Sequence, residues 1–281
     1  MRAMNTLQTI SPLPYRNSFR SGLRTAMLGA AMVEVAASFG MRRLRLGASR
    51  AMSTRERANW LQDAACAVLK RIGMEVLANG DPPLHGLVVS NHLSYLDVLA
   101  YASISPCLFV AKREVQGWPL FGSFATMAGT IYVDRQRGAT NRSAAALMDQ
   151  VLAAGVPVVL FPEGTSSDGQ SVLRFHSRFF EPAVRGNALV TASAVGYSSG
   201  TAEEAVLAYH GKDVFGSHLV RTLGQGHLEA RVAFAPTGAR YADRKDAAQA
   251  TQAEVELLRT VVAGRPAIKP RTDPFRLTRA G

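Results

Sequence analysis

A histidine and an aspartate stand five positions apart in residues 91–97, Asn-His-Leu-Ser-Tyr-Leu-Asp, just after an apolar run. A strand that opens into a turn and a helix is where α/β folds hold reactive groups. On one regular helix the two side chains would lie roughly 140° apart, so pairing requires His92 in the turn and Asp97 in the first helical turns. The carboxylate would then fix the imidazole tautomer and leave the other ring nitrogen to take a proton. The alternative is an ordinary helix start capped by Ser94.

A second buried strand is predicted over residues 158–161, and it also ends in a polar loop, Pro-Glu-Gly-Thr-Ser-Ser-Asp-Gly. Gly164 lets the backbone approach a ligand closely or adopt a positive φ. Glu163 and Thr165 offer an acceptor and a donor at the same rim. The alternative is a plain Asp-Gly turn that closes a hairpin.

A third short strand is predicted over residues 131–133, and Arg135 follows it. Lys112 lies earlier, in Ala-Lys-Arg-Glu. A single arginine after a strand is usually a solvated surface charge. Three strand ends that carry a base, a cation and a carboxylate together favour one shared site.

These segments resemble the glycerolipid acyltransferase superfamily, typified by 1-acylglycerol-3-phosphate acyltransferases. Residues 91–97 match its first motif at every signature position, residues 129–135 resemble the second, and residues 161–165 the third. The resemblance covers about residues 80–200. It implies an α/β fold with a mixed sheet flanked by helices, and transfer of a fatty acyl group from a thioester to a hydroxyl.

With this resemblance, His92 is predicted to act as the general base and Asp97 as the group that orients it. Backbone N–H groups of the strand-to-helix turn are expected to hold the oxyanion. Because a thioester is already activated, no metal or organic cofactor is expected, and acyl-CoA or acyl carrier protein serves as co-substrate. Substrate contacts are predicted for Asn91, Ser94, Lys112, Arg135, Glu163, Gly164 and Thr165, with Asn91 and Ser94 bracing the turn rather than reacting.

One position departs from the family pattern, because Ser166 stands where the third motif usually continues with arginine. An arginine there is expected to help hold the acceptor's phosphate, so its loss removes a bidentate donor. Lys112, Arg135 and Arg178 could compensate. Two acceptors therefore stay open: 1-acylglycerol-3-phosphate, giving phosphatidic acid, and lyso-ornithine lipid, which carries no phosphate.

Two other classes of function compete with an acyltransferase. One is a thioester hydrolase, although no Gly-x-Ser-x-Gly motif is present. The other is a non-catalytic basic protein, because the net charge is +11, but 7% aromatic residues give little support for stacking on nucleic acid. No nucleic-acid partner is expected, and no metal, because the remaining histidines lack metal-ligand spacing. Cys66 and Cys107 are isolated and are predicted to be small buried residues.

The basic charge gathers at the two ends of the chain. Residues 1–73 hold twelve Lys or Arg against three acidic residues, and residues 264–281 hold five against one. Two helices are predicted here, one over residues 21–39 and one from the capping box at Ser53 to about residue 73. The connection between them is rich in arginine (Arg42, Arg43, Arg45 and Arg50). This pattern suits a helical hairpin that lies in the bilayer interface. The alternative is that both helices simply cover the sheet.

We therefore expect an N-terminal tail followed by a basic helical membrane-contact region over residues 1–75, an acyltransferase domain over 76–265 and a basic C-terminal tail over 266–281. The expected partners are a lipid acceptor, the acyl donor and an anionic membrane surface. The expected location is the cytoplasmic face of the inner membrane, as a peripheral or monotopic protein, and no cleavable signal peptide is predicted. Further elements are predicted as helices over 139–152 and 243–262 and strands over 188–195 and 229–234, with 196–228 unassigned.

Overall fold

The computed structural model describes residues 17–47, 50–134, 138–200 and 203–263. Residues 1–16 of the expected N-terminal tail, the expected C-terminal tail and Arg135 lie outside these ranges. The described chain forms a seven-stranded sheet with the order β1-β7-β6-β2-β5-β3-β4. Pairing is parallel except between β6 and β7, so the sheet is mixed, as predicted. The strands are β1 (Met74–Asn79), β2 (Leu87–Ser90), β3 (Leu108–Lys112), β4 (Ile131–Val133), β5 (Val158–Leu160), β6 (Val190–Ser198) and β7 (Leu228–Phe234).

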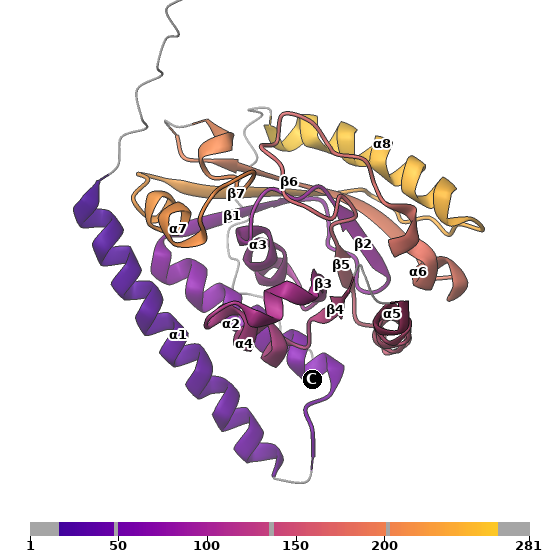
Figure 1. Cartoon of the computed structure of the whole chain (residues 1–281), viewed down its shortest axis with the longest axis horizontal. Helices are drawn as coiled ribbons and strands as arrows, with labels where there is room; N and C mark the ends of the chain where they lie inside the picture. Colours follow the sequence, from indigo (N-terminus) through magenta and orange to yellow (C-terminus); the bar gives the residue numbers. More distant parts are fainter. Residues whose placement is uncertain (1–16, 48–49, 135–137, 201–202, 264–281) are drawn as a thin grey trace, which may run out of the picture.

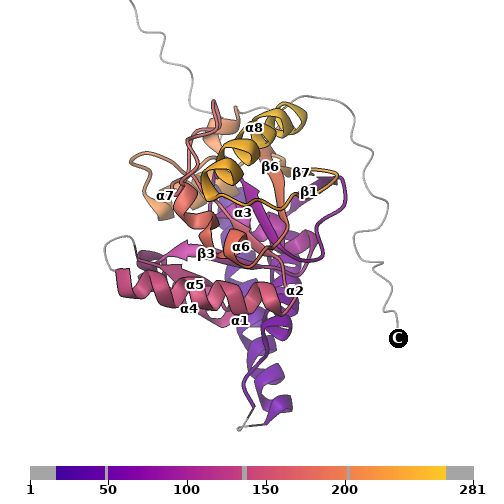
Figure 2. The same ribbon diagram turned by 90° about the vertical axis from the view of Figure 1, so that its right-hand side faces the viewer.

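Helices cover both faces of the sheet (Figures 1 and 2), and each face has its own hydrophobic cluster. The first cluster includes α1 to α4 and α7, and the second includes α5, α6 and α8. The helices are α1 (Ser18–Leu46), α2 (Thr54–Ile72), α3 (Leu96–Ile104), α4 (Phe121–Ala128), α5 (Gly138–Ala153), α6 (Glu181–Arg185), α7 (Phe215–Leu223) and α8 (Arg244–Ala263), with short 3-10 turns η1 (Arg113–Gly117), η2 (Ser177–Phe180) and η3 (Glu204–Val206).

The central strands bring the predicted site together. Strand β2 is buried along its whole length and pairs in parallel with both β5 and β6. Parallel strands end at the same edge of a sheet, so the loops after β2, β5 and β3 lie next to one another. The loop after β2 leads into α3, which places His92 in the loop and Asp97 in the first helical turn, as the spacing predicts.

Helix α1 is longer than the sequence pattern indicates. Arg42, Arg43 and Arg45 belong to its last turns, so the prediction that they form the connection to the next helix is wrong. Arginine is a good helix former, and a cation is favourable near a helix C-terminus. Arg42 also pairs with Asp63 of α2. Within the described ranges, no helix combines the length and apolarity needed to cross a bilayer.

Candidate active site

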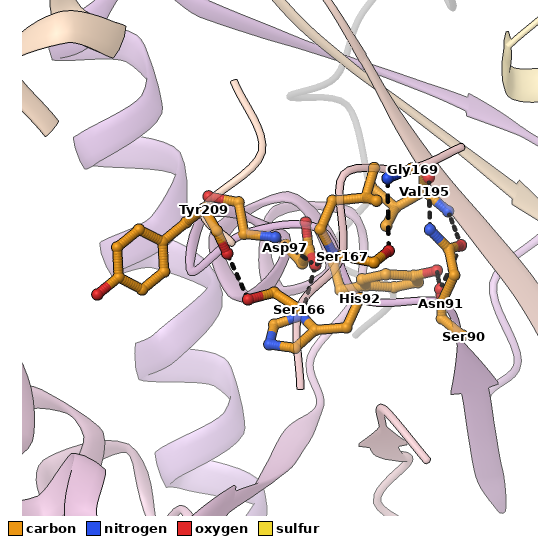
Figure 3. Close-up of polar contacts among 12 residues, drawn as sticks. Ser90, Asn91, His92, Asp97, Ser166, Ser167, Gly169, Val195 and Tyr209 are labelled. Carbon is orange, nitrogen blue, oxygen red and sulfur yellow. Dashed lines mark hydrogen bonds and ion pairs between the residues drawn. The ribbon is translucent and has the colours of Figure 1, made fainter. Parts of the chain in front are cut away.

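His92 and Asp97 form a hydrogen-bonded pair at the end of β2 (Figure 3). His92 Nδ1 lies 2.7 Å from Asp97 Oδ2, and the Asp97 residue is fully buried. The same oxygen accepts backbone N–H bonds from Leu93 at 2.8 Å and Ser94 at 3.1 Å. One carboxylate oxygen thus fixes both the turn and the imidazole. Because Nδ1 faces Asp97, Nε2 is the nitrogen left for proton transfer.

Packing on a second strand end holds the imidazole ring. His92 stacks on Phe161 just after β5, with ring centroids 4.3 Å apart and planes 14° apart. Its carbonyl accepts the N–H of Ser167 at 2.9 Å, which ties the first loop to the loop after β5. The side chain keeps 24% exposure and lines a groove, so the ring is fixed on one side and accessible on the other.

The structure gives Asn91 a bracing role, whereas the buried Ser94 hydroxyl has no hydrogen-bond partner among the described residues. Asn91 exchanges two 3.0 Å hydrogen bonds with the backbone of Val195 on β6, and it does not line the groove. Ser94 is also buried and outside the groove lining. Neither of these two predicted substrate-contact residues therefore lines the groove. The N–H groups of Leu93 and Ser94 are committed to Asp97, so the expectation that this turn supplies the oxyanion donors fails for these two groups.

The groove has a volume of about 430 Å³ and a largely apolar lining. Side chains of α1, α2, α3 and α4 form much of its wall, so it runs from His92 beneath the N-terminal helices. An apolar channel of this kind suits a hydrocarbon chain. Three of the predicted substrate-contact residues also line the groove, namely Lys112, Gly164 and Thr165. Ser166, at the family's arginine position, lines it as well.

The unassigned residues 196–228 supply another part of the groove wall. Tyr209 and Phe215 line the groove, and both pack against Tyr95 of the first motif, with ring centroids 5.6 and 4.8 Å apart. The Tyr95 hydroxyl lies 3.0 Å from Nδ1 of the buried His218, whose Nε2 lies 3.0 Å from the Ala208 carbonyl. His218 thus anchors α7 to the first motif.

Glu163 is buried behind the groove rather than in its lining. Neither carboxylate oxygen has a hydrogen-bond partner among the described residues. Burial raises the pKa of the Glu163 carboxyl to about 8, and the charge of Asp97 adds to the rise. The positive charge of Arg259 acts against this rise. Glu163 therefore holds its proton at neutral pH and is able to donate a hydrogen bond.

This raised pKa predicts how stability changes with pH. Glutamate in the unfolded chain ionises near pH 4.5, and folded Glu163 does so near pH 8. The contribution of the Glu163 proton to the unfolding free energy is complete below pH 4.5. It is lost as pH rises through about 8, by up to about 1.4 kcal/mol per pH unit. Glu163→Gln cannot titrate, so its unfolding free energy relative to wild type should rise between pH 5 and pH 9. Denaturant unfolding at both pH values measures this, with exposed Glu34→Gln as control. Parallel curves for wild type and Glu163→Gln would contradict the assignment.

A buried arginine that the sequence pattern did not reveal holds the loop after β5. Arg259 of α8 donates to the carbonyls of Gly169 and Val195, both at 2.8 Å, and pairs with Glu204 at 2.6 Å. Gly169 adopts φ 83°, and a Cβ there would lie 2.7 Å from a Glu204 carboxylate oxygen. The positive φ therefore favours glycine at this position. The amphipathic pattern of α8 predicted its helix, but not the inward-facing cation.

Comparison with known proteins identifies the family of this chain. Residues 73–196 match a family model described as Acyltransferase. A lyso-ornithine lipid O-acyltransferase of Pseudomonas aeruginosa is 31% identical over 203 residues, covering 70% of this chain and 76% of that protein. The chain belongs to the glycerolipid acyltransferase family. The resemblance predicted from the three motifs is thus confirmed.

Relatives in this family include two kinds of acyltransferase. A lyso-ornithine lipid O-acyltransferase of Rhizobium meliloti is 32% identical over 201 residues, 65% of this chain and 67% of that protein. A 1-acyl-sn-glycerol-3-phosphate acyltransferase of Neisseria gonorrhoeae is 33% identical over 127 residues, 45% of this chain and 50% of that protein. The crystal structure of the LPA acyltransferase PlsC from Thermotoga maritima superposes with a TM-score of 0.63 at 15% identity, over 88% of this chain and 99% of that one. This likeness confirms the predicted fold.

Proposed function

We propose that this chain transfers a fatty acyl group from a thioester donor to the hydroxyl of a lyso-ornithine lipid, with His92 as the general base. The His92–Asp97 pair, open on one side to a long apolar groove, is the observation that carries the proposal. Either acyl-CoA or acyl carrier protein serves as donor, and no cofactor is required because the thioester is already activated.

A single imidazole is enough to carry the proton through the whole transfer. Nε2 of His92 removes the acceptor's hydroxyl proton while the hydroxyl oxygen attacks the thioester carbonyl. Asp97 stabilises the imidazolium that forms. The tetrahedral intermediate collapses, the carbon–sulfur bond breaks, and the imidazolium returns its proton to the departing thiolate. The products are an ester and a free thiol, with no acyl group left on the protein.

The groove favours an acceptor without a phosphate. Among the described residues, Lys112 is the one Lys or Arg in its lining. The Ser166 hydroxyl, at the family's arginine position, donates to the carbonyl of Tyr209. Arg178 lies over the ring of Phe179, 4.9 Å from its centroid, and is not in the lining. A phosphate dianion is best held by several fork-like cationic donors, which the described residues of this wall do not provide.

A second candidate acceptor is 1-acylglycerol-3-phosphate. Lys112 in the groove wall supports it, because lysine binds phosphate as a point charge. The Neisseria gonorrhoeae relative named for this acceptor supports it as well.

A competition experiment separates these acceptors and the rival hydrolase. The protein is incubated with a labelled acyl thioester and equal amounts of lyso-ornithine lipid and 1-acylglycerol-3-phosphate, and products are identified by mass. We expect the label in ornithine lipid. Label mainly in phosphatidic acid would establish the second acceptor, and label only in free fatty acid would contradict transfer altogether.

We further propose that α1 rests on an anionic membrane surface. Apolar side chains on its outer side are exposed, while Leu28, Ala31 and Val35 pack inward. Arg43 and Arg45 lie in its last turn, where they can attract anionic lipid headgroups. The exposed apolar residues are Phe19, Leu23, Met27, Val33, Met41 and Leu44.

Vesicle flotation tests this membrane contact. Val33, 71% exposed on α1, is changed to Asp, and Leu257, 70% exposed on α8 across the sheet (Figure 1), receives the same change as control. Val33→Asp should weaken binding to anionic vesicles about tenfold or more, because an apolar contact is lost and a charge is added. Leu257→Asp should bind like wild type. Equal binding by all three proteins would contradict the proposal.

A further inference from the structure

The two oxygens of Asp97 have different hydrogen-bond partners. Oδ2 is hydrogen-bonded to His92 Nδ1 and to the N–H groups of Leu93 and Ser94. Oδ1 accepts a hydrogen bond from the hydroxyl of Tyr197, on β6. No other hydrogen bond to Oδ1 is found in the described ranges. The carboxylate orientation is therefore fixed from two sides, by its own turn and by a strand one hundred residues away.

Tyr197 is itself held in place. The residue is 6% exposed and does not line the groove. Its N–H donates to Glu204 Oε1 at 2.7 Å, and Glu204 pairs with Arg259. Burial raises the pKa of the Tyr197 phenol, and the neighbouring charge of Asp97 raises it further. The hydroxyl stays protonated, so it acts as a donor to Asp97 throughout the working pH range.

We propose that Tyr197 is a positioning residue that acts on His92 through Asp97. The inference rests on the proposed function, because it assigns a role in the same proton transfer. The phenol hydroxyl fixes the rotation of the carboxylate, which aims His92 Nδ1 and therefore Nε2. It also shares the negative charge of the carboxylate, so Asp97 stabilises the imidazolium less than a carboxylate without this donor would.

Other titratable and charged groups face this assembly from the surrounding elements. Tyr101 comes from α3, Glu163 from the loop after β5, Glu204 from η3 and Arg259 from α8. Glu163 is protonated at neutral pH, and Glu204 is paired with Arg259. A change confined to the Tyr197 hydroxyl leaves all four groups in place.

Tyr197→Phe tests the inference, because it removes the hydroxyl and keeps the ring. We expect kcat to fall about tenfold, the size expected for losing a hydrogen bond to a charged group, with KM for the acceptor unchanged. Without this donor Asp97 holds the imidazolium more strongly, so the acid limb of the kcat/KM profile should move to higher pH. A packing defect alone would not move this limb.

Tyr101→Phe is the matched control. Tyr101 is also buried, and its hydroxyl lies 2.7 Å from Ser90 Oγ and 2.8 Å from Ser193 Oγ rather than against Asp97. The acid limb of the kcat/KM profile of Tyr101→Phe should match that of wild type. An unmoved limb in Tyr197→Phe, or an equal shift in both variants, would overturn the inference.

A second readout works without substrate. NMR titration of the His92 ring in the folded proteins should show the midpoint at higher pH in Tyr197→Phe and unchanged in Tyr101→Phe. If wild type transferred no acyl group, the proposed function would fail, while this titration would still decide the Tyr197 contact. Identical titration midpoints of the His92 ring in wild type and both variants would overturn the inference about Tyr197.

Discussion

His92→Ala is expected to lower kcat for acyl transfer by about 10²- to 10⁴-fold, the contribution typical of a general base. No other described imidazole is held by a carboxylate beside the groove: His210 lines the groove, but no salt bridge to it is found. The loss should appear mainly in kcat, because the groove that binds the hydrocarbon chain remains. Transfer rates with saturating donor and acceptor measure it.

The fold should survive this change. His92 keeps 24% side-chain exposure, so alanine leaves no sealed cavity, and circular dichroism should show native helix content. His210→Ala serves as the control for a histidine in the groove wall. A folded His92→Ala protein that turned over at the wild-type rate would contradict the general-base assignment.

Asp97→Asn and Asp97→Ala should differ in both activity and stability. Asparagine keeps an oxygen for His92 and for the N–H groups of Leu93 and Ser94, and its amide can donate to the Tyr197 hydroxyl. It removes only the charge that stabilises the imidazolium, so we expect a kcat loss about tenfold smaller than for His92→Ala.

Alanine at position 97 leaves buried donors without an acceptor. The N–H groups of Leu93 and Ser94 and the hydroxyl of Tyr197 would lose their partner, at about 1–3 kcal/mol for each unsatisfied group. Asp97→Ala should therefore lower the unfolding free energy by several kcal/mol, while Asp97→Asn should lower it much less. Denaturant titration of both variants measures the difference. Equal stability of the two would show that Asp97 does not organise the turn.

The sequence predicted the elements whose pattern is local and strong. The buried strand before the first motif, the capping box at Ser53 and the amphipathic α8 lie where the patterns place them. Strand β1 was not predicted, because most of its residues are only partly buried and its alternation is weak. Helix α7 was missed because glycines surround it and because its register depends on long-range contacts with α1, such as the Ser21 hydroxyl donating to the Val220 carbonyl at 2.7 Å.

Long-range contacts also explain which parts of the candidate site the sequence could not predict. The His92–Asp97 pair is local and follows from spacing across one turn. Tyr197 contacts Asp97 from one hundred residues away, and Arg259 reaches the loop after β5 from α8. Alternation on β6 would have placed Tyr197 on the same face as Ser193 and Val195, but the predicted strand ended before it.

The central claim is that one imidazole takes the acceptor's proton, and the joint pH dependence of transfer and of the His92 ring tests it most directly. The kcat/KM profile of wild type is measured for acyl transfer, and the His92 ring is titrated by NMR under the same conditions. We predict that kcat/KM falls on the acid side through a single ionisation whose midpoint coincides with that of the His92 ring. Transfer that stays constant while the ring takes up its proton would contradict the account.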